Sequence, residues 1–495
     1  MNISSALKAF RPTTPRSSSE SDVRAITSSN PPAFIAQNFR PQDERSWREA
    51  ATASLRAADG EGAESLEWLS HHPFREESGD ACSKAPVELN LSNMGLTRTD
   101  LRKLGAWLQS RKLQVPIKID LSGNNFGDKC ADELTALLTE PSCVTALNLS
   151  NCELPKRSLS KICAALHENT TLQELKLNLN RFQGCGEHIG AMLLANKTLK
   201  SLGLQGELGG YLERKRMGYQ SIRLIAQALE KNSSLQALDL SSNDWGFKGA
   251  EAMAKMLKEN KTLTELNHRR TPLHRGFKTL CKALEANTTL KRLDLSNNNL
   301  YNKQLVALGS LLKTNKSLQQ LDLSYTRFEC SKEEDWLYYD QFCEGLSLNT
   351  GLRELKIRPW TSAIDNALVS MLRNPTSHIE ALDICGAPLW GKRGLAALTE
   401  AVQANQTLVS FKPGRGSSFT ESELSAIRQA TARNRERRQG LPTQAGPALY
   451  ALLNMAFQKG QVPFLPREMA RELEKAFSAN GDVPAMINTI EAVTG

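Results

Sequence analysis

One short phrase, Leu-x-x-Leu-x-Leu-Ser-x-Asn, returns along the 495-residue chain at a nearly constant interval. Its second leucine, or the apolar residue in that place, serves as a phase marker. Consecutive markers lie 27–30 residues apart, except for two longer steps of 36 and 34 residues. A period of this length predicts a solenoid, in which each repeat buries its apolar face only against its neighbours. The markers are Leu89, Ile119, Leu147, Leu175, Leu202, Leu238, Leu266, Leu293, Leu321, Leu355, Leu382 and Phe411.

Each repeat has two halves of different periodicity. The Leu-x-Leu part alternates apolar and polar residues, which is typical of a short strand with one buried face. The next dozen residues carry apolar positions at helical spacing, as in 249–260, where Ala250, Met253, Met256 and Leu257 share one face. We therefore expect one strand and one helix per repeat, stacked as a parallel inner sheet with outer helices.

An asparagine follows the second strand leucine by three positions in several repeats. It is Asn124, Asn180, Asn243 or Asn298, and Cys152 takes the same place in another repeat. We expect its side-chain amide to satisfy backbone groups where the strand bends away.

These motifs resemble the leucine-rich repeat. The 27–29-residue length is similar to the ribonuclease-inhibitor type, which also includes repeat domains of animal NOD-like receptors and of Ran GTPase-activating protein. The resemblance covers residues 86–415. It implies an α/β fold, a horseshoe of about 12 strand–helix repeats with helical caps. It implies no single function, because such horseshoes serve many unrelated tasks.

Composition limits the classes of function. Apolar residues make up 40% of the chain, and no apolar run approaches 18 residues, so we expect a soluble chain without a membrane span. The ten cysteines are scattered without zinc-site spacing, which predicts free buried thiols and a reducing compartment. No P-loop, GxSxG or HExxH motif occurs, and no cysteine follows Cys385 to serve a thioester ubiquitin ligase. We expect a non-enzymatic protein without metal or cofactor.

The amino-terminal region differs from the repeats. Residues 1–45 are rich in Ser, Thr, Pro and Arg, which predicts a disordered segment. They lack the apolar core of a Sec signal peptide and resemble the export signals of type III secretion systems. A disordered tail without a signal is the alternative.

Residues 46–85 contain amphipathic helical sequence that includes Trp47 and Leu55. We expect a helical cap over the first repeat, because the ends of solenoids need covering. The alternative is a degenerate F-box, since residues 32–56 loosely resemble its order of Pro, Ile, Phe, Pro and Asp. An F-box followed by repeats is the pattern of the GALA effectors of plant-pathogenic bacteria. At the other end, residues 416–495 predict a helical segment whose basic run 433–438 forms a solvated face.

Two insertions lengthen the repeats. Residues 206–218 are basic and glycine-rich, and residues 328–340 are acidic and aromatic. Insertions in solenoids map to loops on one side and often bind partners. An exposed cluster of Trp336, Tyr338 and Tyr339 would suit a binding hot spot. Local packing of these rings on the lengthened helix is the alternative.

The inner face can be written from the repeat register. Asp294 and Asp322 should lie on neighbouring strands, about 4.8 Å apart. Such like charges require relief from water, Arg292 or a basic partner. We therefore predict a partly acidic surface for a basic protein, although Leu-Asp-Leu-Ser is also ordinary repeat sequence. The candidate partner-binding residues are Asp239, Asp294, Asp322, Asp383, Arg269, Arg358, Trp336, Tyr338, Tyr339 and Trp360.

The formal net charge is +9, yet no nucleic-acid module is visible and the inner face is not basic, so nucleic-acid binding is disfavoured. The favoured function is a protein-binding scaffold. It resembles an effector that a plant-pathogenic bacterium secretes by a type III system into the host cytoplasm or nucleus, where it would bind a host protein. The alternatives are a substrate-recruiting subunit of a ubiquitin ligase and a cytoplasmic regulator, such as a GTPase-activating protein.

Overall fold

The computed structural model describes nine stretches of the chain, which are residues 87–111, 116–139, 143–207, 215–272, 276–329, 336–358, 362–385, 391–414 and 418–438. The predicted disordered segment 1–45 and the predicted cap 46–85 lie outside these stretches. So do residues 439–495, two of the ten cysteines, Cys82 and Cys330, and the predicted site residue Trp360.

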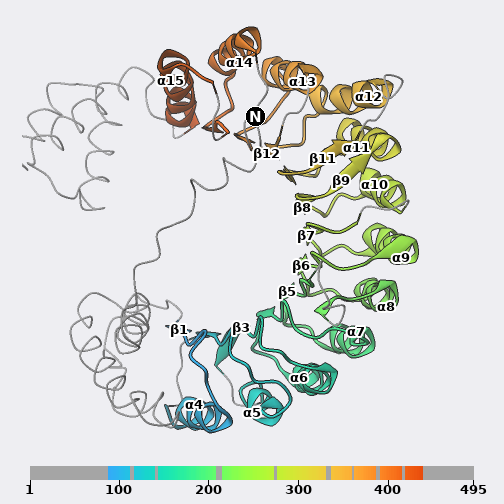
Figure 1. Ribbon diagram of the computed structural model, residues 1–495, viewed down its shortest axis with the longest axis vertical. Helices are drawn as coiled ribbons and strands as arrows, with labels where there is room; N and C mark the ends of the chain where they lie inside the picture. The colour runs from blue at the N-terminus through green and yellow to red at the C-terminus, as the bar shows by residue number, and fades with distance from the viewer. Residues whose placement is uncertain are drawn as a thin grey trace, which may run out of the picture. The chain divides into compact units, whose positions relative to one another are not determined.

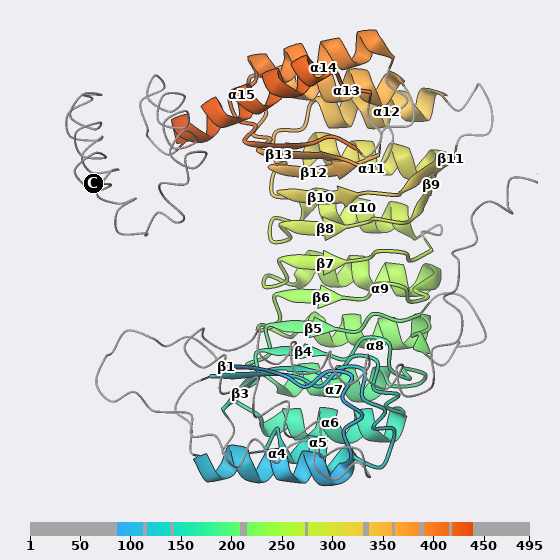
Figure 2. The same ribbon diagram turned by 60° about the vertical axis from the view of Figure 1, so that its left-hand side comes forward.

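The chain divides into two compact units. Unit 1 contains residues 1–245 and 260–263, and unit 2 contains residues 246–259 and 264–495. Within each unit the strands lie side by side and the helices cover one face of the sheet (Figure 1, Figure 2). The opposite face, which the helices leave uncovered, is called the sheet face below.

In unit 1, strands and helices alternate as the two periodicities predict. Its strands are β1 (Val87–Asn90), β2 (Ile117–Asp120), β3 (Val144–Asn148), β4 (Glu174–Lys176), β5 (Ser201–Gly203) and β6 (Ala237–Asp239). Its helices are α4 (Arg98–Arg111), α5 (Ala131–Ala136), α6 (Lys156–Glu168), α7 (Gly186–Ala195) and α8 (Tyr219–Leu229).

Unit 2 continues the alternation and adds two further strands. Its main sheet contains β7 (Glu265–Asn267), β8 (Arg292–Asp294), β10 (Gln320–Leu323), β12 (Glu354–Ile357), β13 (Ala381–Ile384) and β14 (Ser410–Lys412). Its helices are α9 (Gly246–Glu259), α10 (Phe277–Ala286), α11 (Asn302–Thr314), α12 (Trp336–Ser347), α13 (Ser362–Arg373), α14 (Lys392–Ala404) and α15 (Glu421–Arg438). A separate parallel pair, β9 (Asn299–Tyr301) and β11 (Arg327–Glu329), was not predicted from the sequence.

The strand register confirms the predicted phase. In unit 1 the paired Cα positions run through Leu89, Ile119, Leu147, Leu175, Leu202 and Leu238. In unit 2 they run through Leu266, Leu293, Leu321, Leu355, Leu382 and Phe411. The eleven leucine and isoleucine markers are buried between the sheet and the helices. The α/β fold with a parallel sheet of stacked strand–helix repeats is therefore as expected.

Side-chain amides tie successive repeats together where the strands end. Asn180 donates to the carbonyls of Leu149 and Leu177 at 2.7 and 2.8 Å, and its Oδ1 accepts from the amides of Cys152 and Leu154. Asn124, Asn243 and Asn298 make equivalent bonds. The predicted role of this asparagine is confirmed.

A second series of asparagines, which the sequence reasoning missed, lies at the helix ends. Asn196 donates to the carbonyls of Leu166 and Asn169 in the preceding repeat, at 2.7 and 3.1 Å. Its Oδ1 accepts from the amides of Thr198 and Leu199. The Asn-x-Thr-Leu turns therefore connect repeats as well as returning the chain to the next strand.

Both insertions follow a helix that packs closely on the next helix through glycine. In unit 1, a Cβ added at Gly186 of α7 would lie 2.3 Å from Ser221 Cα of α8. In unit 2, a Cβ at Gly345 of α12 would lie 2.1 Å from the Gly309 oxygen of α11. Only glycine permits backbones to approach so closely.

Helix α15 covers the last repeat and packs against α14 and β14. The side chain of Asn434 donates to the carbonyls of Asn405 and Leu408, at 2.9 and 3.0 Å. Arg435 donates to Val409 O at 2.9 Å. The basic run is therefore more than the solvated face expected from the sequence, because part of it binds carbonyls of the repeat before it.

Candidate protein-interaction surface

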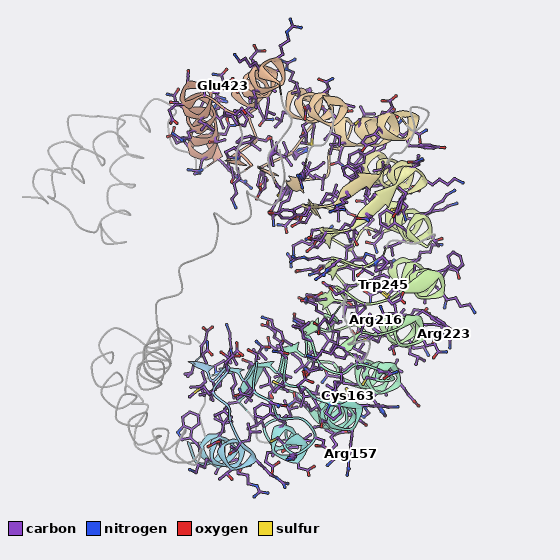
Figure 3. The ribbon with its side chains drawn as sticks, in the orientation of Figure 1. Arg157, Cys163, Arg216, Arg223, Trp245 and Glu423 are labelled. Atoms are coloured by element: carbon purple, nitrogen blue, oxygen red, sulfur yellow. The ribbon has the colours of Figure 1, made fainter. Side chains whose placement is uncertain are left out.

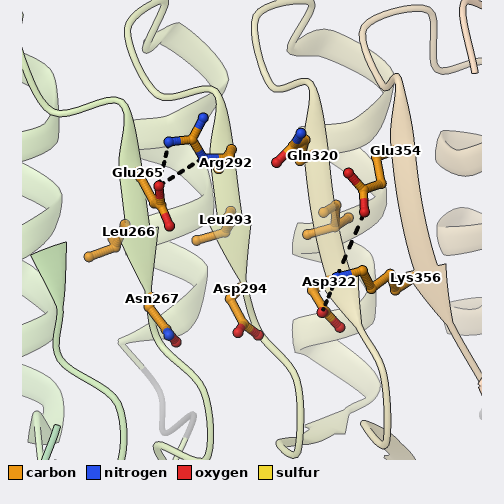
Figure 4. Close-up of a pocket in the computed structure, with 11 residues that line it drawn as sticks. Glu265, Leu266, Asn267, Arg292, Leu293, Asp294, Gln320, Asp322, Glu354 and Lys356 are labelled. Carbon is orange, nitrogen blue, oxygen red and sulfur yellow. Dashed lines mark hydrogen bonds and ion pairs between the residues drawn. The ribbon is translucent and has the colours of Figure 1, made fainter. Parts of the chain in front are cut away.

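The sheet face of unit 2 is hollowed across strands β7, β8, β10 and β12 (Figure 4). Strand geometry causes this exposure, because each middle residue between two buried leucines points away from the helices. Five carboxylates and five cations occupy the sheet face and the strand ends of this unit. They are Glu265, Asp294, Asp322, Glu354, Asp383, Arg269, Arg292, Lys356, Arg358 and Lys412. Formal charges balance over these ten residues, but the hollow itself is lined by four carboxylates and two cations, and the partly acidic binding surface stays a prediction.

Asp294 and Asp322 are direct neighbours in the register of β8 and β10, as predicted. Each carboxylate accepts a hydrogen bond from a backbone amide two residues later, at 2.8 Å, from Ser296 and Ser324 respectively. The hydroxyl of Ser324 also donates to Asp322 at 2.5 Å. These bonds hold both carboxylates on the sheet face and satisfy part of their charge.

A cation relieves only one member of this pair. Lys356 Nζ lies 3.4 Å from Asp322 Oδ2 and 3.7 Å from Glu354 Oε1. Burial would lower the pKa of Lys356, but the charges of Asp322 and Glu354 outweigh it and hold that pKa above its usual value. Lys356 was not among the site residues predicted from the sequence.

Asp294 is the less satisfied carboxylate. Burial raises its pKa, and the charge of Asp322 adds to that rise, while the bonds from Ser296 and the charge of Arg269 oppose it. Among described residues no cation forms an ion pair with Asp294 within 4 Å. Asp294 is therefore a half-buried carboxylate with unmet negative charge.

Arg292 does not supply the relief that the sequence suggested. Its guanidinium forms a salt bridge with Glu265 on β7, with Nε 2.8 Å from Glu265 Oε2 (Figure 4). That pair lies two residues along the strand from Asp294. Arg292 is directly opposite Glu265 in the register of β7 and β8, so the neighbouring strand engages its guanidinium.

The other predicted strand residues divide between the units. Asp383 of β13 accepts a 3.5 Å hydrogen bond from the thiol of Cys385, and Arg358 follows the end of β12. Asp239 lies in unit 1, where it accepts hydrogen bonds from the amide and hydroxyl of Ser241. The structure thus brings Asp294 and Asp322 together on one face and places Asp239 in the other unit.

The sheet face of unit 1 has a second hollow, across β1, β2, β3 and β4. Its charges are paired within it. Lys118 lies 3.0 Å from Glu88, and Lys176 lies 2.9 Å from Glu174. The amide of Asn148 donates to Asp120 at 3.1 Å. This hollow holds no pair of neighbouring carboxylates like that of unit 2.

The aromatic insertion is only partly as predicted. Tyr339 is 4% exposed, and its hydroxyl donates to the Phe328 carbonyl at 3.2 Å. The rings of Phe328 and Tyr339 meet edge to face with centroids 6.3 Å apart. Tyr338 is half-buried, and Trp336 begins α12. The expected exposed cluster is therefore wrong for Tyr339, which belongs to the core, as the alternative of local packing stated.

The thiols and the search for metal ligands add two observations. The described cysteines are all free, and Cys130, Cys152, Cys163, Cys185 and Cys281 are buried (Figure 3 shows Cys163). Burial raises the pKa of Cys152 to about 12, which keeps this thiol protonated. In the described stretches no group of three or more His, Cys, Asp and Glu side chains could hold a metal ion. Over the same stretches, no helix has both the length and the apolar composition to cross a membrane.

Comparisons with known proteins agree with the repeat architecture. A family model described as "Leucine Rich repeat" matches residues 231–254 and 286–308. The chain carries leucine-rich repeats. It is 31% identical over 240 residues to the ribonuclease inhibitor of Mus musculus, and the match covers 48% of this chain and 51% of that protein.

A second ribonuclease inhibitor, from Sus scrofa, is 26% identical over 272 residues, covering 48% of this chain and 57% of the relative. The chain thus spans about half the length of these relatives. Among solved structures, the tropomodulin C-terminal domain of Caenorhabditis elegans matches with a TM-score of 0.24 and 13% identity, over 45% of this chain and 96% of that one. That score is too low to support a functional argument.

Proposed function

We propose that the protein is a non-enzymatic interaction scaffold that binds a partner protein across the sheet face of unit 2. A basic side chain of the partner would pair with Asp294. The half-buried Asp294 carboxylate carries this proposal, because its raised pKa and its neighbour Asp322 mark a negative charge that the described residues do not neutralise. A partner cation placed there would gain a desolvated ion pair.

The name of the relatives supports a binding function, since a ribonuclease inhibitor is named for its action on another protein. Balanced charge on the rest of this face favours a partner whose own charges alternate. Lys356 and Arg292 are already engaged by Asp322, Glu354 and Glu265, so they fix the carboxylates in place more than they attract an anionic partner.

The test is affinity capture from a plant-cell lysate with quantification of every captured protein. The variant Asp294→Asn with Asp322→Asn removes both charges and keeps their shape. A partner should be retained at least about tenfold less by this variant, which corresponds to about 1.4 kcal/mol of binding free energy. Asp120→Asn in unit 1 is the matched control, since Asp120 occupies the same strand position and also accepts hydrogen bonds from a serine two residues later. If the double variant retains every protein that the wild type retains, the proposed surface is wrong.

The finer proposal is that this scaffold is a type III effector acting in the host cytoplasm or nucleus. Its support is the polar, serine-rich composition of residues 1–45. Deletion of 1–45 should abolish export from a bacterium with a type III system, and secretion of the shortened chain would contradict it. The identity of the captured partner separates the remaining alternatives. Core components of a ubiquitin ligase would indicate a substrate-recruiting subunit, and a small GTPase would indicate a GTPase regulator.

A further inference from the structure

In eight described turns that follow a strand, one residue at an equivalent position has a left-handed backbone. In unit 2 these residues are Arg270, Asn297 and Tyr325, with φ of 51°, 56° and 55°. This conformation suits glycine and asparagine and is rare for bulky side chains. In unit 1 the same position holds Asn93, Gly123, Asn151, Leu179 and Ser242.

Packing accounts for the bulky residue of unit 1 but not for those of unit 2. Leu179 is half-buried, whereas Arg270 is exposed and Tyr325 is 56% exposed. Arg270 N donates to Ser296 O at 3.0 Å, a bond that any residue except proline could form. Two large side chains thus keep an unfavourable backbone conformation although both are exposed, which points to a role beyond the core.

Further arginines surround these two residues. Arg269 precedes Arg270, and Arg327 follows Tyr325 by two residues at the start of β11. The turns of Arg270 and Tyr325 belong to repeats on either side of the β8 repeat, so their strands lie about 10 Å apart, two strand spacings. Figure 2 shows β9 and β11 along this edge, beside β8 and β10. We call Arg269, Arg270, Tyr325 and Arg327 the rim patch.

The charge of the rim patch is only partly offset. Arg269 lies close enough to Asp294 to lower the pKa of that carboxyl. Arg270 and Arg327 form no ion pair with any residue that the structure describes. Both side chains are exposed, so the patch presents guanidinium groups next to a tyrosine ring.

We propose that the rim patch binds a short acidic segment of a partner protein. The arginines would pair with its carboxylates, and the Tyr325 ring would pack against an apolar residue within it. This inference rests on the proposed scaffold function and names a second contact of the same partner. The neighbouring carboxylates Asp294 and Asp322 favour a short peptide over nucleic acid, because a polyphosphate backbone needs a longer basic track.

The test uses a labelled ten-residue peptide of glutamates with a central leucine, measured by fluorescence anisotropy on the full chain. In the rim variant, Arg270→Asn with Tyr325→Asn, both positions receive the residue that already lies between them, Asn297. The variant should therefore unfold at the same temperature as the wild type or higher. Its affinity for the acidic peptide should fall at least about tenfold, and added salt should weaken wild-type binding.

The matched control removes one exposed tyrosine and one exposed arginine from α8 of unit 1, by Tyr219→Asn with Arg223→Asn (Figure 3 shows Arg223). It should bind the acidic peptide as the wild type does. An equal loss of peptide affinity in the control, or unchanged peptide affinity in the rim variant, would overturn the proposal. Tighter binding of a twenty-nucleotide single-stranded DNA than of the peptide would replace it with a nucleic-acid site.

The two proposals fail separately. Asp294→Asn with Asp322→Asn should reduce partner capture while leaving acidic-peptide binding intact. Suppose that the rim variant binds the acidic peptide as tightly as the wild type does, while Asp294→Asn with Asp322→Asn still loses the partner. The scaffold proposal then stands and the rim-patch proposal is wrong. If the peptide depends on the rim patch but no captured protein depends on Asp294, the sheet-face proposal is the one that fails.

Discussion

The two units differ in how fully their carboxyl groups are satisfied. In unit 1 the described carboxyls with a shifted pKa, Asp132, Glu133 and Glu153, all have it lowered, and each has a lysine or arginine partner. In unit 2 the outcome is mixed: burial of Glu380 is outweighed by Arg438 and Arg353, which lower its pKa, whereas burial raises the pKa values of Asp294 and Asp365. The same repeat pattern therefore leaves two carboxyls of unit 2 without a compensating cation among the described residues, whereas each shifted carboxyl of unit 1 has one.

Each insertion contributes a buried side chain, Lys215 in unit 1 and Tyr339 in unit 2, so the units differ at other departures from the repeat pattern. Lys215, at the end of the first insertion, is buried and lies 2.6 Å from Glu153 and 3.5 Å from Asn151, two repeats earlier in the chain. The departures from the repeat pattern in unit 1 thus strengthen the fold. In unit 2 the departures at Arg270 and Tyr325 are exposed. This difference is one reason for placing the proposed partner surface on unit 2.

The largest expected effect tests the close packing of helices through glycine, which the two units share. Gly345→Ala in unit 2 and Gly186→Ala in unit 1 should each cost about 3 kcal/mol of unfolding free energy, because the new Cβ would overlap the backbone of a neighbouring helix. Urea denaturation measures both. Gly391→Ala and Gly218→Ala are the controls, since no atom lies within 4 Å of the added Cβ. Equal stability of the variants and their controls would show that the helices can move apart.

Loss of an asparagine between repeats should have a smaller effect. Asn180→Ala in unit 1 removes four hydrogen bonds and leaves buried backbone groups unpaired, which should cost about 2–3 kcal/mol. Asn298→Ala in unit 2 removes the bonds to His268, Leu295 and Thr271 and should cost slightly less. Chemical denaturation measures the loss of unfolding free energy in each variant, and Asn366→Ala, at an exposed position, is the control. A larger loss of unfolding free energy for Asn298→Ala than for Asn180→Ala would contradict this order.

The smallest expected effect depends on pH and has opposite signs in the two units. Burial raises the pKa of Asp365 to about 7, and its Oδ1 has no hydrogen-bond partner. The folded state therefore retains a proton that the unfolded state loses near pH 4, and this stabilisation disappears as the pH rises through about 7. Asp365→Asn should stabilise the protein at pH 8 by about 1 kcal/mol.

Glu153→Gln is the counterpart in unit 1. Lys215 lowers the pKa of Glu153, so the ionised carboxylate stabilises the fold above the unfolded pKa, and this contribution is lost as the pH falls through the folded pKa. The variant should therefore be less stable than the wild type at pH 7 and equal to it in acid. Thermal unfolding from pH 3 to pH 8 measures both variants. Parallel profiles for the two variants would remove the contrast between the units.

Local periodicity was enough to predict the strand register and the role of Asn180. The phase markers became paired Cα positions because a repeat places equivalent residues side by side. It was harder to predict which side chains of neighbouring repeats would pair with each other. The sequence offered Arg292 as the partner of Asp294, yet Glu265 competes for it from the neighbouring strand. Tyr338 and Tyr339 differ by one helical position, and only the packing of α12 decides which is buried.

Helix α15 has a consequence for the end of the sheet. A terminal strand usually presents unpaired carbonyls, which can recruit a strand from another molecule. Beside β14, the carbonyls of Leu408 and Val409 are occupied by side chains of Asn434 and Arg435. An incoming strand would have to displace these side chains before it could pair. We therefore expect α15 to limit edge-to-edge pairing at the start of β14, and a chain without this helix should associate more readily.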